Sequence, residues 1–137
     1  MKKLSLLLII MCLVGFGASA QTNKSRENKK NLTIKEWNLK TGSKTPFLDH
    51  VTTYDASGRK VEETEYASYG QKWRKVYQYE NATTRCTREI EYNDKNKVVR
   101  IRKYEYNSDG TKKKQFNYTP NGKLESTKTY ERFISEQ

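Results

Sequence analysis

The chain has few of the residues on which enzyme and metal chemistry depend. It holds one histidine, His50, two cysteines and two prolines among 137 residues. It contains no Ser-His-Asp set in a recognisable motif, no H-E-x-x-H, no C-x-x-C and no glycine-rich phosphate loop. We therefore expect no catalytic residue, no metal site, no cofactor and no enzymatic activity.

Cysteine is too scarce for an internal disulfide. Cys12 lies in the apolar run near the N-terminus, so removal of that run leaves Cys86 alone. Short exported domains often depend on disulfides, and this one must depend on strand pairing instead. We interpret Cys86 as a small, partly buried strand residue.

The N-terminus has the three parts of a secretory signal peptide. Lys2 and Lys3 form a basic start, residues 4–16 are apolar, and residues 18–20 read Ala-Ser-Ala, a cleavage site. As a helix the apolar run spans roughly 20 Å, short of the ~30 Å hydrocarbon core of a bilayer. We predict a signal peptide over 1–20, cleavage after Ala20, and export to the periplasm, the cell surface or the medium, without a membrane span.

Aliphatic residues are also few. After residue 20, Leu, Ile, Val and Phe make up 16 of 117 residues, below the ~20% that, with high net charge, is typical of disorder. The formal net charge is +11, and +9 once Lys2 and Lys3 are removed. Ten tyrosines and two tryptophans can supply apolar area in place of aliphatic side chains. The periodicity of the chain must therefore decide between a fold and disorder.

Tyrosine recurs with a period near thirteen and marks the turns. Most of these tyrosines end an alternating run, and a glycine or Asn96 follows four residues later, where the backbone favours positive φ. Asp109-Gly110 and Asn121-Gly122 are strong hairpin signals. The structural repeat residues are Tyr54, Gly58, Tyr66, Tyr79, Tyr92, Tyr106, Gly110, Tyr118, Gly122 and Tyr130.

Between the turns, residues alternate with period two and are rich in Thr, Val, Ile and Tyr, as in half-buried strands. The pattern predicts strands near 32–38, 47–54, 60–67, 72–79, 85–92, 97–106, 112–118 and 123–132. The predicted fold is all-β: an antiparallel meander of about eight strands built from hairpin repeats over 31–133, as a single curved sheet or half-barrel. A disordered segment over 21–30 precedes it and a tail over 134–137 follows. We expect the tyrosines on one face and the charged residues on the other.

Two of the turns carry a family resemblance. Residues 54–61 read Tyr-Asp-Ala-Ser-Gly-Arg-Lys-Val, and residues 106–110 read Tyr-Asn-Ser-Asp-Gly. They resemble tyrosine–aspartate (YD or RHS-type) repeats, whose pattern is Y-D-x-x-G-[KR]-[LV]. With a leader ending Ala20-Gln21 and a first strand beginning Asn31-Leu32-Thr33-Ile34, the chain also resembles short secreted domains of unknown function from gut Gram-negative bacteria.

The resemblance covers about Asn31 to Tyr130 and implies a hairpin architecture without a known activity. Long YD-repeat proteins wind their strands into a shell around a toxin domain. This chain has about four recognisable turns, and only Tyr54 is followed by the aspartate of the full motif. Enclosure of a second domain is therefore not implied.

The positive charge and the interleaved aromatic residues provide candidate binding residues. A net positive charge favours encounter with polyanions, and aromatic rings can stack on sugars or bases. The candidate anion- or glycan-binding residues are Trp73, Arg74, Lys75, Tyr77, Arg100, Arg102 and Tyr104. The alternative interpretation of the same residues is structural, with tyrosines packed in the sheet and bases that solubilise it.

We expect a non-enzymatic, secreted or envelope-associated module that binds a protein or anionic polysaccharide of the cell envelope. Nucleic acid is not an expected main partner, because no nucleic-acid motif is present. Two alternatives stay open. One is a structural protein that self-associates through its open edge strands. The other, the least favoured, is a small hydrolase of an anionic polymer that uses Glu or His50.

Overall fold

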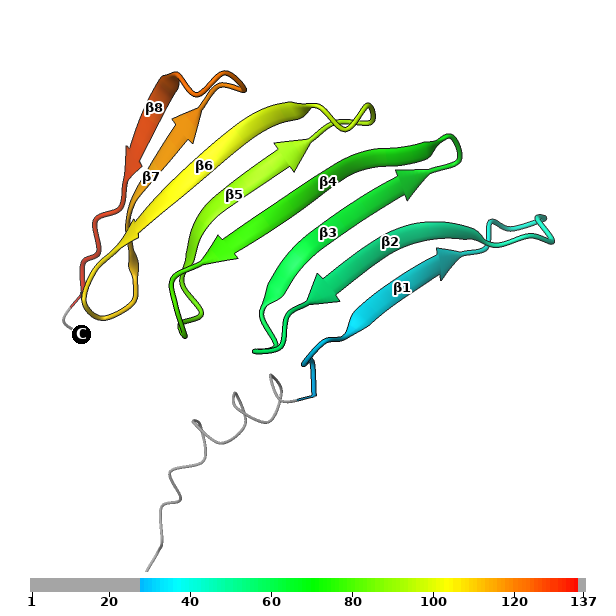
Figure 1. Cartoon of the computed structure of the whole chain (residues 1–137), viewed down its shortest axis with the longest axis horizontal. Coiled ribbons are helices and arrows are strands. Elements are labelled where there is room, and N and C mark those ends of the chain that lie inside the picture. The colour runs from blue at the N-terminus through cyan, green and yellow to red at the C-terminus, as the bar shows by residue number, and fades with distance from the viewer. Residues whose placement is uncertain (1–27, 136–137) are drawn as a thin grey trace, which may run out of the picture.

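The computed structural model describes residues 28–135, and over this range it contains strands, turns and loops but no helix. The strands are β1 Thr33–Asn38, β2 Phe47–Tyr54, β3 Lys60–Ala67, β4 Gly70–Tyr79, β5 Cys86–Tyr92, β6 Val98–Tyr106, β7 Lys112–Tyr118 and β8 Leu124–Thr129. They form one eight-stranded sheet in chain order, each strand antiparallel to the next. The all-β meander is confirmed, as a twisted single layer that does not close into a barrel (Figure 1).

Some predicted segments fall beyond this range. The signal peptide predicted over 1–20 lies outside the described residues, as do residues 21–27 of the segment predicted to be disordered. Residues 28–30 form a turn, in which the Leu32 N–H donates to the Lys29 carbonyl at 3.2 Å.

The strand boundaries differ from the prediction mainly at two ends. β4 begins at Gly70 instead of Lys72, because Gly70, with φ 118°, follows a tight turn and pairs with Ala67. β8 ends at Thr129 instead of residue 132. Its partner β7 starts at Lys112, so the chain beyond Tyr130 has no neighbouring strand left to pair with.

A β-bulge lies opposite the repeat tyrosine of each strand from β2 to β7. At each bulge the following strand contains one extra residue that has no partner in the register. Tyr54 pairs with Lys60 while Thr53 pairs with Glu62, which leaves Val61 as the extra residue. The same shift recurs at every later strand pair. The extra residues are Val61, Lys72, Thr87, Val99, Lys113 and Glu125. Such β-bulges increase the local twist of a sheet, and here they occur at both edges that carry the turns.

Four turns share one hydrogen-bond pattern. In the first, the Asp55 N–H donates to the Arg59 carbonyl at 2.9 Å and the Gly58 N–H donates to the Asp55 carbonyl at 3.0 Å. Equivalent bonds close the turns at 93–97, 107–111 and 119–123. The fourth position has positive φ in each: 72° at Gly58, 57° at Asn96, 85° at Gly110 and 84° at Gly122. The predicted positive-φ positions are thus confirmed.

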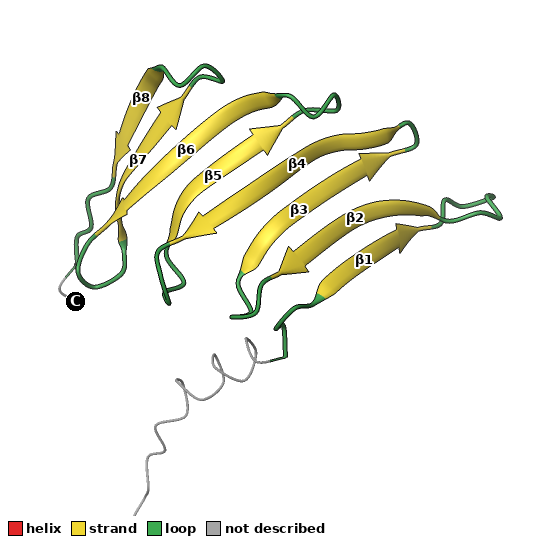
Figure 2. Cartoon of the chain, viewed as in Figure 1, coloured by secondary structure: helices red, strands yellow, loops and turns green. Residues whose placement is uncertain are grey.

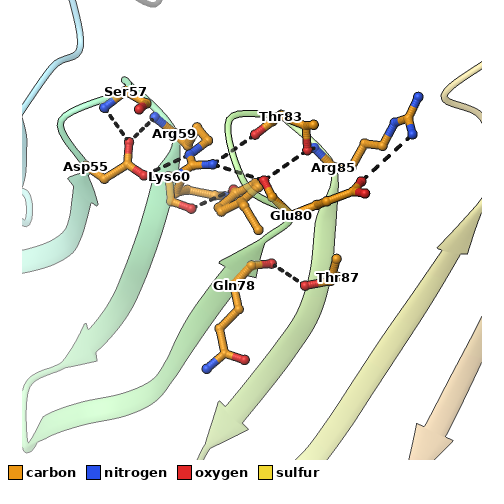
Figure 3. Close-up of polar contacts among 10 residues, drawn as sticks. Asp55, Ser57, Arg59, Lys60, Gln78, Glu80, Thr83, Arg85 and Thr87 are labelled. Atoms are coloured by element: carbon orange, nitrogen blue, oxygen red, sulfur yellow. Dashed lines mark hydrogen bonds and ion pairs between the residues drawn. The ribbon is translucent and has the colours of Figure 1, made fainter.

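Neighbouring turns along one edge are joined by arginine (Figure 3). The Arg59 guanidinium donates to the carbonyls of Thr83, at 3.0 Å, and Glu80, at 3.4 Å, in the next turn on that edge. Arg85 occupies the equivalent place one hairpin later and donates to the Ser108 carbonyl at 3.4 Å. These contacts satisfy carbonyls at the ends of successive hairpins and hold the hairpins side by side.

Among residues 28–135, no other element covers either face of the sheet (Figure 2). Among the described residues no hydrophobic side chain is buried, and Thr64, 4% exposed, is the one buried polar side chain. β1 and β8, the two edge strands, are exposed along their whole length. The sheet is therefore stabilised without an apolar core.

The tyrosines do not share one face. Residues directly paired across strands, and residues two apart along a regular strand, point to the same side of a sheet. By this rule Tyr79 and Tyr106 share a face with Glu89. We call this the glutamate face, defined by Glu63, Glu65, Glu89 and Glu91. Tyr66, Tyr92 and Tyr118 lie on the opposite side, the aliphatic face, which is defined by Val76, Ile90 and Ile101.

The expectation of one tyrosine face and one charged face was therefore wrong. The extra residue at each bulge reverses the alternation along the strand, so successive tyrosines arrive on opposite faces. Both faces consequently carry aromatic and charged side chains together.

Ala82 provides a test of the turn geometry, because it has φ 56° where the other turns use glycine or asparagine. A left-handed conformation costs a residue with a Cβ roughly 1–2 kcal/mol. We expect Ala82→Gly to raise the free energy of unfolding by up to about 1 kcal/mol and Gly122→Ala to lower it by about 1 kcal/mol or more.

Chemical denaturation measures both effects. Ala56→Gly is the matched control, because it loosens the unfolded chain equally in a turn where φ is not positive. Equal effects of Ala82→Gly and Ala56→Gly would contradict the assigned strain.

Candidate functional site

The glutamate face is organised by alternating charge across the strands. Glu63, Lys75, Glu91 and Arg100 are directly paired in one row that runs from β3 to β6. Arg100 lies 3.6 Å from the Glu91 carboxylate. Opposite charges paired in this way stabilise a sheet by about 0.2–1 kcal/mol per pair.

Two tyrosine–glutamate clusters repeat along this face. The Glu63 carboxylate accepts hydrogen bonds from Lys60, at 2.8 Å, and from the Tyr77 hydroxyl. One hairpin later, the Glu89 carboxylate accepts from Arg102, at 2.6 Å, and from the Tyr104 hydroxyl, at 3.0 Å. The repeated arrangement shows that each carboxylate anchors a tyrosine of the following strand.

A third, uncharged version of the cluster occurs near the last strand. The Tyr130 hydroxyl donates to Gln115 at 3.1 Å, and Gln115 stands 26 residues after Glu89. Lysines cover the rings in the first two clusters: Lys60 lies 4.9 Å from the ring centroid of Tyr77, and Lys112 lies 4.2 Å from that of Tyr104. The structural repeat is therefore the hairpin of about 26 residues.

Protonation equilibria follow from these contacts. Burial, together with the hydrogen bond to Glu63, raises the pKa of Tyr77 far above its ordinary value, and burial beside Glu89 does the same for the pKa of Tyr104. Burial raises the pKa of Tyr79 to about 12. Burial opposes ionisation of Glu63, but the hydrogen bonds from Lys60 and Tyr77 outweigh it and lower the pKa of that carboxyl.

The predicted binding residues divide between the two faces. Register places six of them on the glutamate face: Trp73, Lys75, Tyr77, Arg100, Arg102 and Tyr104. Arg74 lies on the aliphatic face, where it pairs with Glu62 at 3.1 Å and stands 4.2 Å from the ring centroid of Tyr92.

Most of these residues already have partners within the chain. Arg100 and Arg102 are paired with Glu91 and Glu89, and the hydroxyls of Tyr77 and Tyr104 are bonded to carboxylates. The Lys75 ammonium lies 4.7 Å from the ring centroid of Trp73. These side chains therefore contribute to the sheet more than they offer free charge to a ligand.

His50 lies on the glutamate face beside a carboxylate. Its Nε2 is 3.8 Å from Glu63, and its ring meets that of Trp73 edge-on at 5.9 Å. Among residues 28–135, no group of three or more His, Cys, Asp and Glu side chains is arranged to hold a metal ion. Cys86 is half-buried on β5, and burial raises the pKa of its thiol.

Acidic and basic residues are distributed unevenly along the chain, and the net charge of +11 for the whole sequence does not show this. Residues 47–94 hold nine acidic and seven basic residues, a net charge of −2. Residues 95–135 hold four acidic and eleven basic residues, a net charge of +7. Within the described range every ion pair uses a carboxylate from Asp55 to Glu91, and no ion pair involves a cation beyond Arg102.

The chain beyond Arg102 therefore keeps its positive charge. Its carriers past Arg102 are Lys103, Lys112, Lys113, Lys114, Lys123, Lys128 and Arg132. None of the predicted binding residues is in this set. The segregation could have been found by counting charge in separate segments of the sequence.

A surface hollow of about 310 Å³ opens near the β4–β5 turn, between β5, β6 and β7. It is lined by Glu80, Arg85, Thr87, Tyr104, Glu105, Tyr106 and Lys113. Arg85 and Glu80 lie 3.8 Å apart there (Figure 3). Lys113 makes no ion pair within residues 28–135, so the hollow combines charged side chains of both signs with one cation that lacks a carboxylate partner.

No protein-family model and no curated protein sequence matches this chain. Among solved structures, it is similar to a TarM variant of S. aureus in complex with Fondaparinux, alpha-GlcNAc-glycerol and UDP, at 12% identity and a TM-score of 0.30. The alignment covers 85% of this chain and 23% of that one. A likeness this weak carries no argument about the fold or function of the present protein.

Residues 28–135 contain no helix with the length and apolar character that a membrane span requires.

Removal of the anchored hydroxyls tests the two clusters. A hydrogen bond to a charged group contributes about 1.5–3 kcal/mol, and solvent exposure lowers that value. We expect Tyr77→Phe and Tyr104→Phe each to lower the free energy of unfolding by about 1 kcal/mol or more. Tyr69→Phe is the matched control, because Tyr69 is 70% exposed. Indistinguishable values for Tyr77→Phe and Tyr69→Phe in denaturant titrations would refute the anchoring role.

The same clusters predict how stability depends on pH. A raised tyrosine pKa means that the unfolded chain loses its proton first, so stability is full below about pH 10 and falls as pH rises further. On the acid side, the lowered pKa of Glu63 makes stability fall as pH drops below about 4.3. Tyrosinate absorbance in a pH titration should show a late-ionising group of tyrosines, and a single transition near pH 10 without loss of structure would contradict the assignment.

Proposed function

We propose that this protein is an exported, non-enzymatic β-sheet module that binds an acidic polysaccharide through the basic strands β6–β8. The observation that supports this most is the segregation of charge. Residues 95–135 carry +7, and cations past Arg102 form no ion pair within the described range. A surface of this kind attracts a polyanion and releases its counterions on binding.

The position of the charge also favours a polymer over a small ligand. Basic side chains are distributed over three neighbouring strands and the turn at 119–123, and several are exposed. Neighbouring strands lie about 4.8 Å apart. An extended acidic chain that crosses the aliphatic face would therefore meet Arg88, Lys103 and Lys114 on successive strands.

The predicted site over Trp73–Tyr77 supports this proposal less than the basic strands do. Its arginine is neutralised by Glu62, and its Lys75 lies between Glu63 and Glu91. We assign these residues to the stability of the sheet and transfer the binding role to β6–β8.

Self-association through the edge strands is the second candidate. β1 and β8 are exposed, which is the condition for pairing with a second sheet. Lys35 on β1 and Lys128 on β8 place positive charge on both edges, and charged edge residues disfavour edge-to-edge pairing. The charge therefore favours an anionic partner over a second copy.

A binding titration tests the proposal. The purified chain is titrated with dextran sulfate, polygalacturonate and uncharged dextran, and with phosphatidylglycerol vesicles to detect a lipid surface. We expect binding to the acidic polysaccharides, none to dextran, and an affinity that falls linearly on logarithmic axes as salt rises. Binding to vesicles alone, or binding unaffected by salt, would contradict it.

Charge-matched variants locate the binding strands. Lys113, Lys114 and Lys123 are changed to Gln together, and the control changes Lys35, Lys40 and Lys44 to Gln, which removes the same charge near β1. Each lysine that no longer neutralises an anionic group of the polymer reduces the salt slope by about 0.7–0.9. We expect the affinity of the first variant to fall at least roughly tenfold and that of the control much less. Equal decreases would show that net charge alone governs binding.

A further inference from the structure

Two cations face each other across β5 and β6 on the aliphatic face. Arg88 and Lys103 are directly paired in the register. Like charges placed directly opposite destabilise a sheet, whereas most charged rows of this protein alternate in sign. This pair is the exception, in a sheet that has no apolar core to compensate for repulsion.

No carboxylate neutralises the pair. Glu89 and Glu91 point to the other face, and within residues 28–135 neither Arg88 nor Lys103 forms an ion pair. Glu105 shares the aliphatic face with Lys103, but it is paired in the register with Lys114. The positive charges of Arg88 and Lys103 are therefore available to bind an anion from solution.

One N–H group of the Arg88 guanidinium also lacks an acceptor. Its Nε is buried and has no hydrogen-bond partner. A buried donor left unsatisfied costs about 1–3 kcal/mol, more when it is charged. An oxyanion is the ligand that satisfies a guanidinium best, because two oxygens can accept from two of its N–H groups together.

The surroundings of the pair fit a sugar. Phe116 is directly paired with Lys103, and Lys103 lies 5.2 Å from the ring centroid of Tyr118. The surface hollow is a separate feature, because its lining tyrosines Tyr104 and Tyr106 lie on the glutamate face.

We infer that Arg88 and Lys103 form a subsite for the oxyanion of an acidic sugar residue, with Phe116 beside the sugar. This inference rests on the proposed polysaccharide binding and adds a specific position to it. Carboxylate and sulfate ester share the required chemistry.

Single substitutions test the subsite. Arg88→Gln and Lys103→Gln are compared with Lys44→Gln, which removes one charge from an exposed loop between β1 and β2. We expect the affinity of each subsite variant for dextran sulfate or polygalacturonate to fall at least roughly tenfold, and that of the control less than about threefold. The polymer that shows the larger decrease identifies the sulfate ester or the carboxylate as the bound group.

A second readout uses inorganic sulfate without a polymer. At fixed ionic strength, replacing chloride by sulfate should raise the melting temperature of the wild type more than that of Arg88→Gln or Lys103→Gln. Sulfate also stabilises any folded protein in a non-specific way. The change in melting temperature of the variants, which lack the proposed site, measures this general effect.

The outcomes separate the two claims. If the wild type binds the polymers and the subsite variants behave like Lys44→Gln, the subsite is wrong and the proposed function stands. If the wild type binds no acidic polymer, the proposed function fails, and an unequal sulfate effect would still support an anion site at this pair. An equal sulfate effect in all variants would overturn the subsite.

Discussion

Within the described part of the chain this sheet has no second layer, so each side chain is stabilised by its neighbours on the same face. Cross-strand pairs contribute about 0.2–1 kcal/mol each, which requires many of them to replace an apolar core. The protein meets this requirement with alternating charge, anchored tyrosine hydroxyls and lysines placed over rings. A single carboxylate can take part in several of these interactions: Glu63 contacts Lys60 and Tyr77 and lies 3.8 Å from His50. Substituting one such carboxylate affects three strands.

The dependence on paired charges explains why the unpaired ones point to function. In a sheet where most arginines are matched to carboxylates, Arg88, Lys103 and the lysines of β7 form no ion pair within the described residues. The tyrosine–glutamate clusters lie mainly on β3–β6, and the net charge of +7 lies from residue 95 onward. Stability is thus assigned mainly to β3–β6 and binding mainly to β6–β8, and the two roles meet on β5 and β6.

The repeating tyrosine and its glycine allowed the eight strands and the positive-φ turns to be predicted, because local turn chemistry and period-two alternation are encoded over a few residues. The distribution over faces was not predictable in the same way. An extra residue such as Val61 or Thr87 reverses the alternation, and nothing in its identity marks it as a bulge. The partners of the candidate site were hidden for a related reason: Trp73–Tyr77 is basic and aromatic in the sequence, while Glu62 and Glu63, which contact Arg74 and Tyr77, come from another strand.

The heat capacity change of unfolding tests the central claim, a sheet stabilised by polar cross-strand pairs without an apolar core, most directly. Exposure of apolar surface dominates this quantity, which averages about 12–15 cal/mol/K per residue in globular proteins. Calorimetry of the purified chain at several concentrations should give a value per residue of the sheet well below that range, with a melting temperature independent of concentration. A value within the range, or a melting temperature that rises with concentration, would mean that an apolar face is buried after all and would contradict the account.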